Sequence, residues 1–363
     1  MISISKPDIG DAEKQAVMEV LDSGMLLQGP RTALLEERFA EVCGTRYAVA
    51  TSSGTTALHL ALAAHGVGPG DEVITTPFTF IASVNSIIYT GARPIFVDIE
   101  EDTFNLNPAL IEAAITPRTK ALLPVHLYGY PCDMDAILNI AERYNLAVIE
   151  DAAQAIGADY RGQKVGSFGT GCFSLYATKN VMSGEGGMIT TNDDALAQRC
   201  RMLRSHGMQR RYYHDILGYN FRMTDLHAAI GLVQLNRLQE FTTRRRANAA
   251  YLNAHLTSVV TPRVREGYGH VWHQYTVRVR QTPEVAAAQA RDAAVNRLTE
   301  AGVGTGVFYP LPANKQAHLR EIGLGDISLP VAENMANEVI SLPVHPRLSQ
   351  ADLETIVREV NKL

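Results

Sequence analysis

The amino-acid sequence predicts an α/β fold: a large domain with a mostly parallel, mixed sheet flanked by helices, and a smaller C-terminal α+β domain. Short β-branched runs alternate with helical patterns from about residue 46 to 192, which is the pattern of a sheet covered by helices. A length of 363 residues suggests roughly two domains, and a hydrophobic content of 46% is enough for large cores.

The strands of the large domain are expected where β-branched and apolar residues cluster. Seven segments fit this pattern: 47–51, 72–76, 94–99, 121–125, 147–150, 172–176 and 188–191. Between them, apolar residues recur at three- and four-residue spacing in 57–65 and 134–144, which predicts amphipathic helices.

The second half of the chain begins with a helical pattern after Thr224 that could continue to Leu256 as one long connecting helix. We place the domain boundary there, with a large domain at 1–245 and a small one at 246–363, on which the N-terminal segment could pack. Arginines 244–246 are interpreted as solvated helix surface. The small domain is expected to contain strand-like segments 271–279 and 303–308 and a helix over 286–300.

Composition favours a cytoplasmic enzyme. The N-terminus lacks a charged start followed by an apolar stretch, and no run of 18 apolar residues could span a membrane. Four separated cysteines give neither a zinc site nor a disulfide framework, so no metal is expected. The net charge of −5 argues against nucleic acid as a partner.

Lys179 is the most informative residue. It lies 28 residues after Asp151, which ends an apolar run, and a glycine-rich segment, 183–187, follows it directly. An enzyme that uses pyridoxal phosphate (PLP) needs an amine that forms an imine, an acid beside the pyridine nitrogen, and a turn that holds phosphate. The order of these motifs indicates a Schiff-base lysine.

The phosphate site is expected at the Ser/Thr/Gly turn 51–56, between a strand and the helix near Ala57. Unpaired N–H groups at a helix N-terminus attract phosphate, although the same turn also suits an ordinary N-cap. Asp151 is placed at the carboxyl end of a strand, where ligands of open α/β sheets gather. A helical turn after it would bring Gln154 to the same side; the alternative is that Asp151 caps a helix at Ala152.

A free lysine has a pKa of ~10.4 and is almost fully protonated at neutral pH. To act as a nucleophile and then as a proton shuttle, Lys179 requires surroundings that lower its pKa. Lowering it by about 2 to 3 units costs about 3 to 4 kcal/mol, which desolvation and a nearby cationic ring can supply.

The chain closely resembles the DegT/StrS family of sugar aminotransferases, PLP enzymes of the aspartate aminotransferase fold (fold type I). The resemblance covers nearly the whole length, and it is the order and spacing of the motifs that make it specific. The matching segments are 53–58, 79–85, 124–129, 150–155, 173–180, 184–188, 218–223 and 342–346.

The resemblance implies a role for each matching position. Lys179 would be the Schiff-base lysine and Asp151 the partner of the pyridine nitrogen, and both would be catalytic. The remaining cofactor contacts would be Phe80 stacking on the ring, Gln154 at the phenolic oxygen, Gly54, Thr55, Thr56 and Ser174 at the phosphate, and Asn220 at the phosphate of the neighbouring subunit. This last role would make the protein a homodimer with shared active sites.

Four further residues would contact the substrate: His126, Arg222, Tyr309 and Asn314. The chain departs from many relatives in the segment 309–316, where Asn314 stands in place of a histidine. We expect this segment to line the substrate pocket. His126 could instead only support the wall of the active site.

The implied activity is transfer of an amino group from glutamate to a keto group of a nucleotide-linked hexose, giving an amino sugar. Two alternatives remain open: a PLP-dependent sugar dehydratase, and a PLP-binding regulator without turnover. Some relatives that dehydrate sugars carry histidine in place of the Schiff-base lysine, and this chain keeps Lys179. Transamination is therefore the favoured interpretation.

Overall fold

A seven-stranded sheet forms the centre of the structure, a computed structural model that describes residues 1–279 and 286–363. Its strand order is β1–β9–β8–β5–β4–β2–β3. The bounds are β1 Tyr47–Thr51, β2 Glu72–Thr75, β3 Arg93–Phe96, β4 Thr119–Leu123, β5 Ala147–Asp151, β8 Thr170–Ser174 and β9 Gly187–Thr191. Only the two pairs made by β9 are antiparallel. The predicted mostly parallel, mixed sheet is confirmed.

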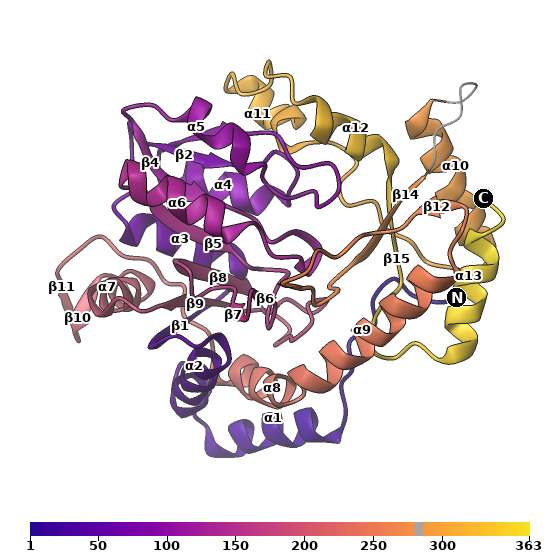
Figure 1. Ribbon diagram of the computed structural model, residues 1–363. Helices are drawn as coiled ribbons and strands as arrows, with labels where there is room; N and C mark the ends of the chain where they lie inside the picture. The colour runs from indigo at the N-terminus through magenta and orange to yellow at the C-terminus, as the bar shows by residue number, and fades with distance from the viewer. Residues whose placement is uncertain (280–285) are drawn as a thin grey trace.

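Helices cover both faces of this sheet (Figure 1). Because strand residues alternate between faces, neighbours such as Val73 and Ile74 belong to different cores. One core holds α3 (Gly54–Ala64), α4 (Ile81–Tyr89) and α7 (Asp194–Arg204). The opposite face is covered by α2 (Pro30–Cys43), α6 (Met134–Tyr144) and α8 (Asp225–Asn236).

A smaller antiparallel sheet of β12 (Val259–Val260), β14 (Tyr275–Val279) and β15 (Val339–Leu342) carries the C-terminal part. Its core is shared with α9 (Leu238–His255), α10 (Ala287–Glu300) and α13 (Gln350–Val360). Ile2 forms a parallel bridge with Val303, so the N-terminal segment packs against this part. Figure 1 shows both chain ends on that side of the molecule.

The remaining elements are short or peripheral. They are α1 (Asp11–Ser23), α5 (Ile111–Ala114), α11 (Ala317–Glu321), α12 (Pro330–Glu338), the 3-10 helices η1 (Pro108–Leu110), η2 (Leu127–Gly129) and η3 (Ala313–Lys315), the hairpin β10 (Met208–Arg210) and β11 (Tyr213–His214), and the sheet β7 (Gln163–Lys164), β6 (Asp159–Tyr160) and β13 (Tyr268–Gly269). None of the helices within the described residues is long and apolar enough to cross a membrane.

Two expectations for the second half of the chain were wrong, and one strand was not expected. The long connecting helix is interrupted at Arg237, whose ψ of 2° departs from helical geometry and whose guanidinium is held by Asp8 at 2.7 Å. Segment 303–308 is no strand: it makes single bridges at Val303 and Gly306, because its glycines weaken a ladder. The strand β15 pairs with β14 instead and was not foreseen.

Candidate active site

A cavity of 880 Å³ lies at the carboxyl ends of β5 and β8, where it meets residues of the C-terminal part. Of the residues expected to form the site, eight line this cavity: Gly54, Thr55, Phe80, Asp151, Gln154, Ser174, Lys179 and Tyr309. These residues come from distant parts of the chain. The tertiary structure therefore brings together most of the residues that the motifs indicate.

The start of α3 forms one wall of the cavity. Ser53 is the N-cap and its hydroxyl accepts the N–H of Thr56 at 3.2 Å, so the capping interpretation is correct, and the helix begins three residues earlier than expected. Among the described residues, the N–H groups of Gly54 and Thr55 donate to no protein acceptor. A Cβ on Gly54 would lie 2.8 Å from the Cβ of Ser174. Glycine thus brings two free donors close to a serine, which suits a phosphate group.

Asp151 ends β5 and is 5% exposed. Its carboxylate accepts hydrogen bonds from the Ser83 hydroxyl at 2.7 Å and the Ala153 N–H at 3.1 Å. Burial raises the pKa of Asp151, while these hydrogen bonds and Lys179 oppose the rise. The chain after Asp151 forms turns rather than a helix, yet Gln154 still lines the same cavity. A protonated ring nitrogen is the cationic partner that this carboxylate suits.

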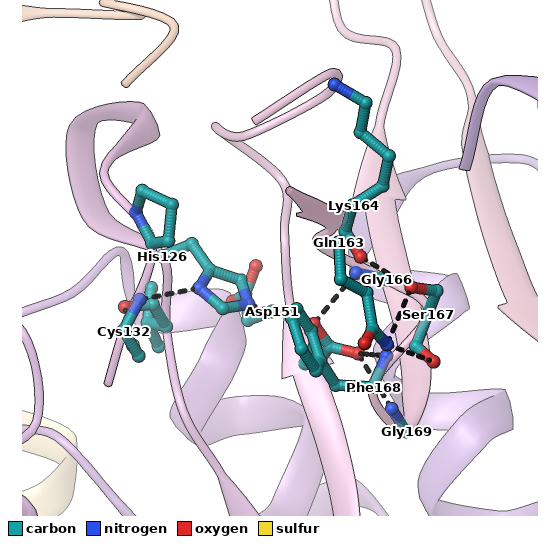
Figure 2. A network of polar contacts seen from close by, with 12 residues as sticks. His126, Cys132, Asp151, Gln163, Lys164, Gly166, Ser167, Phe168 and Gly169 are labelled. Carbon is teal, nitrogen blue, oxygen red and sulfur yellow. Dashed lines mark hydrogen bonds and ion pairs between the residues drawn. The ribbon is translucent and has the colours of Figure 1, made fainter. Parts of the chain in front are cut away.

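Glu150 precedes Asp151 and points to the opposite side of β5. Its buried carboxylate accepts the N–H groups of Gly166, Phe168 and Gly169 at 2.7 to 3.0 Å (Figure 2). It also contacts His126 Nε2 at 3.1 Å, and His126 Nδ1 accepts the Cys132 N–H. Both ring nitrogens of His126 are thus engaged outside the cavity wall, where they support the strand that carries Asp151.

Lys179 follows β8 in a tight loop, with its N–H bonded to the Tyr176 carbonyl. Within the described part of the chain, its ammonium group makes no ion pair or hydrogen bond. Burial lowers the pKa of Lys179 to about 8, and the negative charge of Asp151 opposes this effect. About a tenth of the amine is therefore unprotonated at pH 7, which a nucleophilic lysine requires.

Phe80 and Tyr309 form the aromatic side of the cavity, with ring centroids 6.3 Å apart. Phe80 is 57% exposed although it sits on a cavity wall, so its ring face is available for stacking. The Tyr309 hydroxyl accepts a hydrogen bond from Gln154 Nε2 at 3.3 Å, and Gln154 Oε1 accepts the N–H of Tyr128. The hydrogen bond from Tyr128 fixes the orientation of the Gln154 amide.

Several expected site residues lie elsewhere. Thr56, Arg222 and His126 do not line the cavity. Asn314 is fully buried and donates to the Ile327 carbonyl at 3.1 Å, also outside the cavity wall. Asn220 is exposed and lies outside the cavity of its own chain.

Several residues of the cavity wall were not singled out as site residues from the sequence, among them Ser83, Arg245 and His273. The interpretation of residues 244–246 as solvated surface was wrong for Arg245, which is only 5% exposed. The missed signal was periodicity, because Arg245 shares a helical face with the buried residues Phe241 and Ala249.

The described residues hold no cluster of His, Cys, Asp or Glu that could bind a metal ion. Instead, the donor set fits PLP: free N–H groups and a serine for a phosphate, a carboxylate for a ring nitrogen, an aromatic face and an amine of lowered pKa. PLP, when bound, supplies an electron sink for chemistry at a carbon bearing an amino group.

Comparisons with known proteins agree with this geometry. The model of the DegT/DnrJ/EryC1/StrS aminotransferase family matches residues 7–361. A "pleiotropic regulatory protein" of Geobacillus stearothermophilus is 44% identical over 96% of this chain and 94% of its own length. A GDP-perosamine synthase of Caulobacter vibrioides is 43% identical over 100% of this chain and 98% of its own.

Among solved structures, the PLP form of a putative sugar aminotransferase from Streptococcus pneumoniae superposes with a TM-score of 0.94. It is 31% identical, and the match covers 99% of this chain and 98% of that one. The same protein is also known in its PMP form. This chain therefore belongs to the DegT/DnrJ/EryC1/StrS aminotransferase family, whose enzymes depend on pyridoxal phosphate.

Proposed function

We propose that this protein transfers an amino group from glutamate to a keto group of a nucleotide-linked hexose, giving an amino sugar. The observation that carries the proposal is the placement of Lys179 and Asp151 in one cavity with the free N–H groups at the start of α3. The name of the Caulobacter relative, a synthase of a GDP-linked product, supports a nucleotide-linked substrate.

Lys179 would bond the cofactor and, once displaced by the amino donor, would take a proton from the donor's α-carbon and return one. Such positioned proton transfer contributes ~10² to 10⁴ in rate. Asp151 would hold a proton at the ring nitrogen, which keeps the ring electron-withdrawing. Gln154 would contact the phenolic oxygen, Phe80 would stack on the ring, and Gly54, Thr55 and Ser174 would hold the phosphate. Thr56 is left out of this set because its N–H and its hydroxyl are bonded to Ser53.

Two features of assembly belong to the same proposal. Asn220, exposed and outside its own cavity, would reach the phosphate in the neighbouring subunit of a homodimer. The division into units 1–245 and 246–363 would place the boundary inside α9, with the cavity between the two units.

The test is the absorption spectrum of the purified protein loaded with PLP, before and after excess glutamate. We expect the visible band to disappear in the wild type and the product 2-oxoglutarate to appear, because the amino group passes to the cofactor. Lys179→Ala should abolish both, while the exposed Lys120→Ala should change neither. A panel of nucleotide-linked keto sugars should then restore the visible band with the true acceptor.

A regulator that binds PLP without turnover is the second candidate, which the name of the Geobacillus relative favours. It predicts a yellow protein whose spectrum is indifferent to glutamate and to every keto sugar. That result would overturn the proposed transamination.

A further inference from the structure

Arg245 is a buried cation that has no counterion among the residues that the structure describes. It lies on α9 and is 5% exposed. Its Nη1 donates to the carbonyls of Trp272 at 3.0 Å and His273 at 3.3 Å, but its buried Nε has no partner in the described part of the chain. Among the described residues no carboxylate pairs with it, whereas its exposed neighbour Arg244 pairs with Glu240 at 3.1 Å.

An unpaired buried charge costs several kcal/mol, so its persistence calls for an explanation. Burial lowers the pKa of Arg245 to about 9, and at neutral pH the guanidinium still carries its charge. Two backbone carbonyls satisfy one end of the guanidinium and leave the charge uncompensated. An anionic ligand would supply the missing partner.

The free side of Arg245 faces the active site. Arg245 lines the main cavity and also a 20 Å³ recess that opens beside it. Four residues line both spaces: Ser5, Thr178, Lys179 and Arg245. The guanidinium is therefore accompanied by two hydroxyl groups and lies on the same side of the cavity as the lysine.

None of the other charged groups near Arg245 is paired with it in the described structure. Asp8, which lines the recess, pairs with Arg237 and Arg347 instead. Lys179 is mostly protonated at neutral pH and adds a second positive charge. Burial, with Lys179 and Arg245 nearby, lowers the pKa of His273 well below its usual value, so this histidine is neutral. Its Nδ1 donates to Asn180 Oδ1 at 3.2 Å, an orientation fixed because the Asn180 amide donates to the Val271 carbonyl. The acidic residues of the cavity wall, Asp151 and Glu185, form no ion pair with Arg245 in the described structure.

We propose that Arg245, together with the hydroxyl groups of Ser5 and Thr178, binds a carboxylate of the amino donor beside Lys179. The planar guanidinium can donate two parallel hydrogen bonds to one carboxylate. The recess beside it has a volume of only 20 Å³. The phosphate donors Gly54 and Ser174 belong to the wall built by α3 and β8. This inference rests on the proposed function, since it names how that function's donor is recognised.

The test measures binding apart from turnover. Glutarate, a dicarboxylate without an amino group, and its neutral analogue glutaramide are titrated calorimetrically into the PLP-loaded protein. We expect Arg245→Gln to weaken glutarate about 10- to 100-fold, the loss of a charge-assisted hydrogen-bond pair, and to leave glutaramide unchanged. The matched control Arg244→Gln, a neighbouring exposed arginine, should bind both as the wild type does.

Arg245 also anchors two backbone carbonyls, so Arg245→Lys is the second variant if the glutamine variant does not fold. Lysine keeps the positive charge but lacks the planar, two-pronged donor geometry of the guanidinium. An intermediate loss of affinity for glutarate, with the affinity for glutaramide unchanged, supports the proposal. Unchanged glutarate affinity, or an equal loss for glutaramide in either variant, overturns it. The two proposals can fail separately. If glutamate removes the visible band of the wild-type protein, a negative result with the Arg245 variants concerns only the carboxylate site and leaves the proposed transamination standing.

Discussion

Lys179 shows how one side chain acquires its chemistry from burial. Because the pKa of Lys179 is lowered to about 8, its reactive neutral amine becomes the main form at a pH about two units lower than in a free lysine. The nearby Asp151 works in the opposite direction and favours the ammonium form. The balance of these two effects should be visible in how the protein captures its cofactor.

We predict that the rate at which the apoprotein bonds added PLP rises about tenfold per pH unit below pH 8 and levels off above it, because only the unprotonated amine attacks. Stopped-flow absorbance measures this rate. Asp151→Asn removes the charge that favours the ammonium form, so the midpoint should move to lower pH. A rate that keeps rising to pH 10 would show that Lys179 is not desolvated.

Glu150 is a second residue whose effect can be measured. Glu150→Gln replaces an acceptor oxygen by a donor facing backbone N–H groups that have no other acceptor in this network. We expect a loss of roughly 2 to 3 kcal/mol in the free energy of unfolding, measured with urea on the apoprotein. The exposed Glu142→Gln should stay within about 0.5 kcal/mol of the wild type.

At the level of elements, α8 is joined to the start of α2 through one buried carboxylate. Asp225 accepts the N–H groups of Gly29, Arg31 and Thr32 and the Thr32 hydroxyl, at 2.6 to 3.0 Å. It therefore caps a helix that is remote in sequence, where Gly29 offers no side-chain acceptor of its own.

We predict that Asp225→Ala lowers the free energy of unfolding by about 2 to 4 kcal/mol, because one buried and two partly buried N–H groups lose their acceptor. Thermal or urea unfolding checks this loss, and the exposed Asp326→Ala is the control. A change no larger than that of the control would mean that water or another side chain replaces the cap.

For the whole molecule, the proposed dimer has a test that does not depend on size measurements. If Asn220 contributes to the active site of the neighbouring subunit, each active site takes its Lys179 from one subunit and its Asn220 from the other. Lys179→Ala and Asn220→Asp then damage an active site from different subunits. A heterodimer of the two variants then contains one doubly altered site and one native site. Random pairing should restore about a quarter of wild-type activity per protomer.

The two inactive variants are co-expressed with different tags. Activity is measured in the unseparated mixture and in the heterodimer, which is isolated by purification on both tags in turn. A site completed within one chain predicts no recovery in the mixture. Co-expression of Lys179→Ala with itself under both tags gives the background.

The sequence by itself determined the large sheet and the elements with strong local signals. β1 and α6 match their predicted bounds, since β-branched runs and helical spacing act over a few residues, and α6 also has a local cap in Asp133. Lys179, Asp151 and the α3 turn could be found because phosphate and imine chemistry require particular residue types in particular local settings.

Only the tertiary structure decided which charges are buried and what they face. Helical periodicity places Arg245 on the same face as Phe241 and Ala249, but only the packing of α9 against the C-terminal part removes that face from water and leaves Arg244 paired at the surface. The break at Arg237 and the pairing of β15 likewise depend on contacts between distant segments. Burial and long-range pairing are properties of the assembled chain, so local patterns alone do not encode them.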